Sequence, residues 1–312
     1  MKKQTLKSQR AEDAVHASHP MLIGRQPELA QMRACLKAKK NVLLEGPVGV
    51  GKTLLALEMT QALGVPVFRV DGDSRYSEQK LSGWFDPPSV VKKGFSSDTF
   101  MAGPLVEAMR AGGVLFINEL NRLPEGVQNV LLPAIDERLI VVPRLGEIRA
   151  ADGFLVVATQ NPKEFVATSH LSEAILDRFE LIALDYQSES DEVEIVNQRL
   201  GADAGLSGEW KNLPLASVKL VRMTRSHSRI RRGASVRAAI SMAEIAQIFS
   251  LDGMSFQEAF LQSACLALPT RIEWERDAES ELSARAELQV LLKEWVDSIL
   301  AEFSNPSLKK KT

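Results

Sequence analysis

The stretch "NVLLEGPVGVGKTLLALEM", residues 41–59, decides the fold of this chain. An apolar run leads into a loop with the spacing G-x-x-x-x-G-K-[ST], and a helical pattern follows the loop. A strand before this spacing and a helix after it are the context in which it forms a phosphate-binding loop. Successive backbone N–H groups of such a loop surround phosphate oxygens, and the helix N-terminus adds partial positive charge. The sequence therefore predicts a P-loop that binds a nucleoside triphosphate.

The residues of this predicted loop have separate tasks. Lys52 places a positive charge at the β- and γ-phosphates, and the Thr53 hydroxyl is a ligand for Mg²⁺. An ordinary glycine-rich turn is the alternative, but such a turn does not require the flanking strand and helix. The expected nucleotide-binding residues of the loop are Gly46, Pro47, Val48, Gly49, Val50, Gly51, Lys52 and Thr53.

Apolar runs of strand length alternate with helical patterns through the first 185 residues. The runs are 41–45, 66–71, 113–118, 153–159 and 179–184, and the helical patterns include 51–63, 104–111, 124–137 and 171–178. This alternation predicts a parallel α/β sheet. After Tyr186 the strand patterns stop, and the expected helices are 189–201, 214–224, 234–250, 255–267 and 279–303.

These patterns divide the chain into four predicted parts. They are a flexible basic arm (1–20), an α/β nucleotide-binding domain (21–186), a helical lid domain (187–305) and a basic tail (306–312). Two stretches interrupt the alternation. Residues 86–100 contain short β-prone pieces, and residues 138–154 predict a hairpin whose turn is "PRLGE".

Composition indicates a globular protein of a reducing compartment. The chain has 312 residues, 45% of them hydrophobic, and a net charge of −2. It therefore exerts no overall attraction on nucleic acid or on an anionic membrane. No apolar run reaches the ~18 residues that a membrane-spanning helix needs, and residues 1–20 lack the apolar stretch of a secretory signal. Cys35 and Cys265 show no metal-type spacing, so we expect a cytoplasmic protein.

A second apolar run, "GVLFINE" at residues 113–119, ends in Asn118 and Glu119. Ligands of open α/β sheets bind at the carboxyl ends of the strands, so Glu119 is expected to polarise the attacking water. Asn118 stands where such sites usually have an aspartate that holds Mg²⁺ through a water. An amide oxygen still accepts a hydrogen bond but carries no charge, so metal affinity should fall. The alternative is that both residues merely end a strand.

Five segments occur together in one order: the P-loop, "GGVLFINELNRLPEGVQNVLLPAIDER", "VVATQNP", "LSEAILDRF" and "GASVRAA". In these segments the chain resembles the MoxR family of AAA+ ATPases, over roughly residues 20–300. The resemblance implies an α/β fold, a P-loop AAA+ parallel-sheet sandwich with a smaller C-terminal all-helical lid domain. It also implies Mg-ATP as the ligand and ATP hydrolysis as the reaction.

The same resemblance implies roles for residues outside the P-loop. Ile23, Gly24 and Arg25 match the segment that packs on the adenine. Asn161 matches the sensor-1 residue, whose amide orients the attacking water. Arg178 matches the arginine finger, which reaches the γ-phosphate held by a neighbouring subunit and stabilises charge in the transition state. Arg237 matches sensor 2, which couples the position of the lid to the nucleotide.

Plainer alternatives remain for these residues. The segment at Ile23 could be an ordinary helix entry, Asn161 a structural amide, and Arg178 the partner of Asp177 or Glu180. Residues 211–243 contain no acidic residue, which indicates a basic lid face over the triphosphate, a solvated helix face or a subunit interface. The arginines of this stretch are Arg222, Arg225, Arg229, Arg231, Arg232 and Arg237.

The resemblance implies a homo-oligomer, a hexameric ring, that remodels or matures a protein client with a separate partner carrying a von Willebrand factor A domain. Residues 86–100 and 139–150 match inserts that face the pore or a partner, and plain surface loops are the alternative for both. An ATP-binding scaffold with little hydrolysis is the alternative that Asn118 favours. A nucleic-acid motor rests only on the basic residues 211–243, which lack interleaved aromatic side chains. A chelatase-type subunit is a minor variant, since the histidines are scattered.

Overall fold

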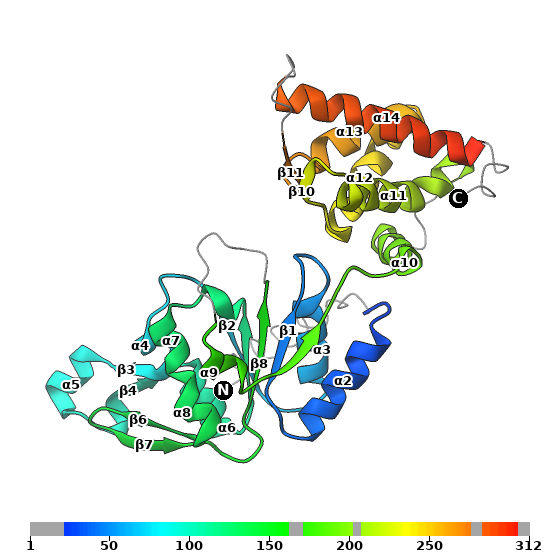
Figure 1. Ribbon diagram of the computed structural model, residues 1–312. Coiled ribbons are helices and arrows are strands. Elements are labelled where there is room, and N and C mark those ends of the chain that lie inside the picture. Colours follow the sequence, from blue (N-terminus) through cyan, green and yellow to red (C-terminus); the bar gives the residue numbers. More distant parts are fainter. Residues whose placement is uncertain (1–21, 162–170, 202–206, 276–282, 305–312) are drawn as a thin grey trace, which may run out of the picture. The chain divides into compact units, whose positions relative to one another are not determined.

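The computed structural model describes residues 22–161, 171–201, 207–275 and 283–304 (Figure 1). The predicted basic arm (1–20) and basic tail (306–312) lie outside the described residues. The chain forms two compact units. The first comprises Arg25–Tyr186, and the second comprises the described residues up to Gly24 together with those from Gln187 onward.

The first unit is built on a sheet of five strands in the order β2-β5-β8-β1-β9. Every pairing in this sheet is parallel, as the alternation of apolar runs and helices predicts. The central strands are buried on both faces: the side chains of Leu115, Phe116 and Ile117 have no exposed area. All five predicted runs form these strands, which are β1 (Val42–Glu45), β2 (Val67–Asp71), β5 (Val114–Asn118), β8 (Leu155–Gln160) and β9 (Glu180–Ala183).

Helices flank this sheet (Figure 1). They are α2 (Gln26–Lys37), α3 (Lys52–Gln61), α6 (Pro104–Ala111), α7 (Glu125–Asn129), α8 (Leu131–Asp136) and α9 (Glu173–Leu176), with the 3-10 helix η2 (Leu120–Arg122). The continuous helix predicted for residues 124–137 is wrong, because the chain breaks into α7 and α8 at Val130. Pro133 lacks the N–H that would bond back to residue 129 across this break.

The two predicted interruptions are both present, and they contact each other. The hairpin is confirmed as β6 (Leu139–Val142) and β7 (Gly146–Arg149). The β-prone reading of residues 86–100 is incomplete, because a helix capped by the Asp86 side chain fills much of it. At the hairpin turn, the Arg144 guanidinium lies 4.2 Å from the centre of the Phe95 ring. The elements in and around residues 86–100 are α4 (Glu78–Ser82), β3 (Gly83–Phe85), α5 (Pro87–Lys93), η1 (Ser97–Thr99) and β4 (Phe100–Ala102).

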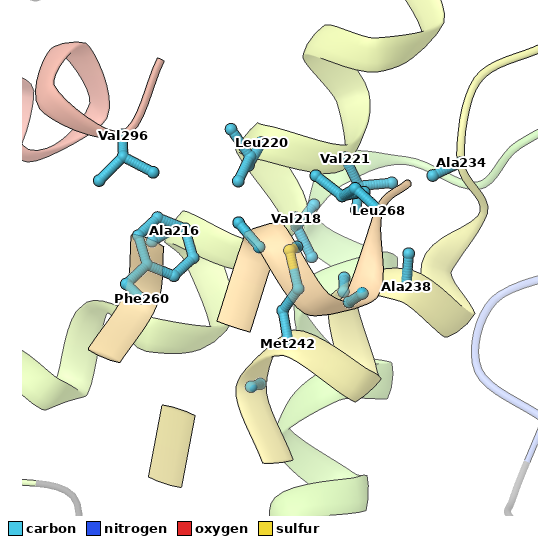
Figure 2. Packing of buried hydrophobic residues seen from close by; sticks show 14 of the residues in the cluster. Ala216, Val218, Leu220, Val221, Ala234, Ala238, Met242, Phe260, Leu268 and Val296 are labelled. Carbon is cyan, nitrogen blue, oxygen red and sulfur yellow. The ribbon is translucent and has the colours of Figure 1, made fainter. Parts of the chain in front are cut away.

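The second unit is helical and has its own apolar core. Figure 2 shows Leu220, Met242, Phe260 and Val296 gathered in that core, and all four have no exposed area. The statement that strands stop after Tyr186 is wrong, because β10 and β11 form a short antiparallel pair. Strands this short leave no period-2 pattern to detect. The elements are α10 (Glu189–Leu200), η3 (Gly208–Asn212), α11 (Leu213–Ser226), β10 (Ile230–Arg232), α12 (Val236–Leu251), α13 (Phe256–Ala267), β11 (Glu273–Trp274) and α14 (Ala284–Ser304).

Candidate phosphate-binding site

The predicted P-loop joins β1 to α3, as its sequence context requires. Lys52 is the first residue of α3. Its side-chain ammonium donates hydrogen bonds to the carbonyl oxygens of two loop residues, Gly46 (2.6 Å) and Pro47 (2.7 Å). A Cβ atom at Gly46 would lie 2.1 Å from the carbonyl oxygen of Leu184. Only glycine therefore lets the loop begin this close to the end of β9.

A buried arginine, Arg25, forms a hydrogen bond with the backbone of the P-loop. Arg25 adopts a left-handed backbone conformation with φ of 63°, and its side chain is 5% exposed. Its guanidinium donates to the carbonyl oxygen of Val50 at 3.0 Å and to that of Asp185, and it pairs with Glu28 at 2.8 Å. Arg25 thus ties the P-loop to the segment that follows β9.

The Asn118 side chain forms three hydrogen bonds at the carboxyl edge of the sheet. Its amide oxygen Oδ1 accepts hydrogen bonds from the hydroxyls of Thr53 (3.0 Å) and Thr159 (3.1 Å). Its amide nitrogen Nδ2 donates to the Asp71 carboxylate at 3.1 Å. Asp71 is directly opposite Asn118 in the β2–β5 register. The structure therefore brings the two predicted metal-binding residues, Thr53 and Asn118, into direct contact.

Glu119 follows Asn118 in a left-handed conformation, with φ of 60° and ψ of 56°. Its backbone N–H donates to the Thr159 hydroxyl at 2.9 Å, and its carboxylate pairs with Arg122 at 2.8 Å. The loop after β2 passes close by: the Gly72 N–H donates to the Asn118 carbonyl at 2.7 Å. A Cβ atom at Gly72 would lie 2.1 Å from the Glu119 carbonyl oxygen, so this approach also requires glycine.

The predicted sensor-1 residue lies at the same edge of the sheet. Asn161 comes directly after β8 and is 6% exposed. Its backbone carbonyl accepts a hydrogen bond from the side-chain amide of Asn121 at 3.3 Å. The segment after β5 is therefore tied to the segment after β8, and Glu119 and Asn161 both follow strands that end side by side.

The predicted arginine finger forms an ion pair within its own unit. The Arg178 guanidinium holds the Asp136 carboxylate at the end of α8, with a shortest N–O distance of 2.6 Å. The hydrogen bond to Asp136 raises the pKa of Arg178 above its ordinary value, so the group is positively charged. Neither Asp177 nor Glu180, the two alternatives that the sequence offered, is this partner.

The remaining predicted residues belong to the second unit. The backbone carbonyl of Ile23 accepts a hydrogen bond from the Gln187 side-chain amide at 2.5 Å. A Cβ atom at Gly24 would lie 3.0 Å from the Asp191 carboxylate. Arg237 is exposed in the first turn of α12.

The basic stretch of residues 211–243 does not form a uniformly basic face. Arg222 and Arg225 both pair with Glu192, whose side chain is 2% exposed, at 3.1 and 2.7 Å. Two further arginines, Arg229 and Arg231, pair with Glu287 and Glu275. Four of the six arginines in this stretch thus pair with three carboxylates of the same unit. These ion pairs offset part of the charge on which the nucleic-acid motor alternative rested.

Asp71 itself is held in place by a second partner. The Arg69 guanidinium, two residues earlier on β2, contacts both carboxylate oxygens at 2.7 and 3.0 Å. That hydrogen bonding and charge hold the pKa of Asp71 below its ordinary value, with a smaller contribution from the Asn118 amide. A charged carboxylate therefore faces Asn118 at neutral pH.

Sequence reasoning missed two residues of this cluster, Asp71 and Thr159. Both are polar and lie within one residue of the end of an apolar run, as Asn118 does. Polar residues at the carboxyl ends of parallel strands meet at one edge of the sheet. That shared position is the signal that would have found them.

Residues 41–179 match the AAA domain family, in its dynein-related subfamily. An uncharacterized protein of Staphylococcus haemolyticus is 30% identical over 224 residues, which cover 70% of this chain and 83% of that protein. The chain belongs to the AAA+ family. The AAA domain match spans the P-loop and four strands of the parallel sheet, β1, β2, β5 and β8, and it ends just before β9.

Two solved structures share the AAA+ fold of this chain. A mutant form of Thermotoga maritima RuvB has a TM-score of 0.54 and 19% identity, covering 79% of this chain and 71% of that chain. NtrX from Brucella abortus in complex with ADP has a TM-score of 0.53 and 17% identity, covering 95% and 73%. At these identities the likeness concerns the fold alone.

Two features are absent from the described residues of this AAA+ protein. No helix within 22–161, 171–201, 207–275 and 283–304 combines the length and apolar character needed to cross a membrane. In the same ranges, no group of three or more His, Cys, Asp and Glu side chains is arranged to hold a metal ion.

Proposed function

We propose that this AAA+ protein binds Mg-ATP at its P-loop and hydrolyses it. One observation supports the proposal: the Thr53 hydroxyl and the Asn118 amide oxygen lie 3.0 Å apart. Thr53 directly follows Lys52, the first residue of the helix after the loop. Parallel α/β sheets bind their ligands at this edge. The NtrX complex supports the adenine nucleotide, since that protein holds ADP within the same fold.

The donor atoms suit Mg²⁺, which prefers oxygen ligands and keeps several waters beside one or two protein groups and the phosphates of a nucleotide. Thr53 supplies a hydroxyl oxygen, and Asn118 supplies an amide oxygen 3.0 Å away from it. Once bound with ATP, Mg²⁺ neutralises charge that develops on the phosphates. In this assignment Thr53 is the direct ligand, and Asn118 acts through a water.

We assign the activation of water to Glu119 and its orientation to Asn161. A general base such as a carboxylate must be held within hydrogen-bond reach of the water that it activates. The contact of the Glu119 N–H with Thr159 fixes the backbone of that residue, and Arg122 holds its side chain. Burial of Asn161 one residue past β8 limits the positions that its amide can take.

We assign Arg178 to the active site of a neighbouring subunit, which makes the working form a homo-oligomer, a hexameric ring. Arg178 would exchange its contact with Asp136 for a phosphate held by that neighbour. The Arg178 side chain is 28% exposed, so it is accessible to a second chain. Ile23 and Gly24 are assigned to the adenine, and Arg237 to coupling between the lid and the nucleotide.

The client and the partner rest on the resemblance to MoxR proteins. On that basis we propose chaperone-like remodelling of a protein client in the cytoplasm, together with a separate partner that carries a von Willebrand factor A domain. The two interruptions of the sheet frame are the proposed contact surface, because the contact between Arg144 and Phe95 joins them.

The experiment is Mg²⁺-dependent ATP hydrolysis by the purified full chain, beside Lys52→Ala and Glu119→Gln. We expect turnover by the wild type only, and we expect Glu119→Gln to keep its ATP affinity. Wild-type turnover equal to that of Lys52→Ala, with ATP still bound, would instead establish a nucleotide-dependent scaffold.

Mixing two inactive variants tests whether the site is shared. A subunit with Arg178→Ala keeps its P-loop, and a subunit with Lys52→Ala keeps its arginine. Mixed assemblies therefore contain some complete sites, and hydrolysis should reappear on mixing. If the mixture stays as inactive as its components while assembling normally, Arg178 does not act between subunits.

A further inference from the structure

We infer that Asp71 is a positioning residue for the Mg²⁺ of this site, because it holds the Asn118 amide with its oxygen toward Thr53. The inference rests on the proposed function. It explains how the site can use an asparagine where an aspartate was expected.

An amide, unlike a carboxylate, has two different ends. Its oxygen accepts hydrogen bonds, whereas its nitrogen only donates them. If the side chain of Asn118 turned over, N–H groups would face the Thr53 hydroxyl and any water on a nearby cation. A neutral amide therefore serves this position in one of its two orientations only.

The contacts fix that orientation from both sides. A charged carboxylate is purely an acceptor, and the Asp71 carboxylate lies 3.1 Å from Asn118 Nδ2, so it selects the nitrogen. On the other side, the hydroxyls of Thr53 and Thr159 donate to Oδ1 at 3.0 and 3.1 Å. Turning the amide over would bring Oδ1 against the carboxylate.

Asp71 is itself well placed for this task. Its backbone is directly opposite that of Asn118 in the parallel register, and the Arg69 guanidinium holds both of its carboxylate oxygens. Arg69, Asp71 and Asn118 therefore form a chain of contacts that leads to the Thr53 hydroxyl. Groups that orient metal ligands in this way are typically worth roughly 10–100-fold in metal affinity.

Asp71 and Asn118 also form a matched pair across the two strands. An aspartate in place of Asn118 would need no orientation, because both of its oxygens accept hydrogen bonds. It would, however, place a second negative charge about 3 Å from Asp71, and the two carboxylates repel each other until a bound cation relieves the repulsion. Orientation by Asp71 therefore adds to metal binding only beside an asparagine, whereas the negative charge of Asp71 attracts a cation in either case.

The test measures the affinity of the full chain, saturated with ADP, for Mn²⁺ in place of Mg²⁺. The electron paramagnetic resonance signal of unbound Mn²⁺ gives the amount of ion that is bound. The variants are Asp71→Ala, Asn118→Asp and the double variant. Asp152→Ala is the matched control, since it also removes an ion-paired, exposed carboxylate of the same unit. ADP affinity in chelator is measured for each protein, so that Mn²⁺ binding is always compared at saturating ADP.

We expect Asp71→Ala to weaken Mn²⁺ binding by roughly tenfold in the wild-type background. In the Asn118→Asp background, which needs no orientation, the same change should weaken Mn²⁺ binding by a clearly smaller factor. A purely structural role would weaken binding equally in both backgrounds. Asp71→Asn, which keeps the shape of the side chain, should fall between wild type and Asp71→Ala.

Two results would overturn the inference and leave the proposed function standing. The first is an Asp71→Ala protein that binds Mn²⁺ as tightly as Asp152→Ala does. The second is an equal loss of Mn²⁺ affinity in the wild-type and Asn118→Asp backgrounds. If the wild type binds ADP but shows no bound Mn²⁺, the proposed metal site is wrong, and the inference about Asp71 fails with it.

Discussion

Replacing Thr159 with valine tests whether the hydroxyl of this residue organises the site. Thr159 is fully buried. Its hydroxyl donates to Asn118 Oδ1 at 3.1 Å and accepts the Glu119 N–H at 2.9 Å. Valine keeps the branched shape of threonine but removes both hydrogen bonds. The substitution therefore perturbs the two strand ends without opening a cavity.

The expected cost follows from these two bonds. Leaving the Glu119 N–H without an acceptor costs about 1–3 kcal/mol, and the bond donated to Asn118 adds about 1 kcal/mol. A total of about 3 kcal/mol lowers the melting temperature of a unit of this size by roughly 6–12 °C. Because Glu119 loses its backbone anchor, ATP turnover should fall more than ADP affinity does.

Thr60→Val is the matched control for this experiment. Thr60 is equally buried, but its hydroxyl donates to the carbonyls of Ala56 and Leu57 in its own helix. Its loss removes a donor to carbonyl oxygens rather than the acceptor of a backbone N–H, so the expected cost is under about 1 kcal/mol. Thermal melting and ATP turnover of both variants give the comparison. A Thr159→Val protein that melts with or above Thr60→Val would refute the reasoning.

Three further predictions concern other parts of the chain. Arg178→Ala should reduce ATP hydrolysis by at least about 10³-fold at unchanged ATP affinity, and a parallel loss of affinity would show that the arginine acts through the fold. Gly72→Ala places a Cβ atom 2.1 Å from the Glu119 carbonyl oxygen, so it should lower stability by about 1–3 kcal/mol, and an unchanged melting curve would contradict the contact. Burial and then the nearby Glu180 raise the pKa of the Cys35 thiol, so alkylation should increase with pH along a curve displaced upward from that of free cysteine. A curve that coincides with free cysteine argues against that environment.

The parallel sheet could be predicted because its strands are nearly continuous apolar runs. Strands covered on both faces, such as β5 and β8, need apolar residues at every position. The P-loop could be predicted for a related reason, since its glycine and lysine spacing is fixed by the phosphates it surrounds. Both features are encoded locally, in segments of fewer than about twenty residues.

The contacts between strands could not be predicted in the same way. Nothing in "PVFRVD" shows that β2 lies beside β5 or that Asp71 is opposite Asn118. Those neighbours depend on the strand order and on the register, which arise from the packing of the whole unit. The role inferred for Asp71 therefore depends on the strand order and register of the folded sheet.

The arginines of the second unit illustrate the same limit. Their stretch has no acidic neighbour in sequence, which left a basic lid face, a solvated helix face and a subunit interface as alternatives. Their carboxylate partners come from distant elements: Glu192 is in α10 and Glu287 in α14. The break between α7 and α8 and the short β10–β11 pair were missed because each involves too few residues to change a periodic pattern.

The central claim is that the site around Lys52, Thr53 and Asn118 is a working ATPase site despite its asparagine. The most direct measurement is phosphate release from Mg-ATP by the wild-type chain and by Glu119→Gln, at matched and saturating ATP. We expect turnover that requires Mg²⁺, rises with protein concentration and disappears in Glu119→Gln while ATP remains bound. Phosphate release that is the same in the two proteins, or that does not depend on Mg²⁺, would contradict it.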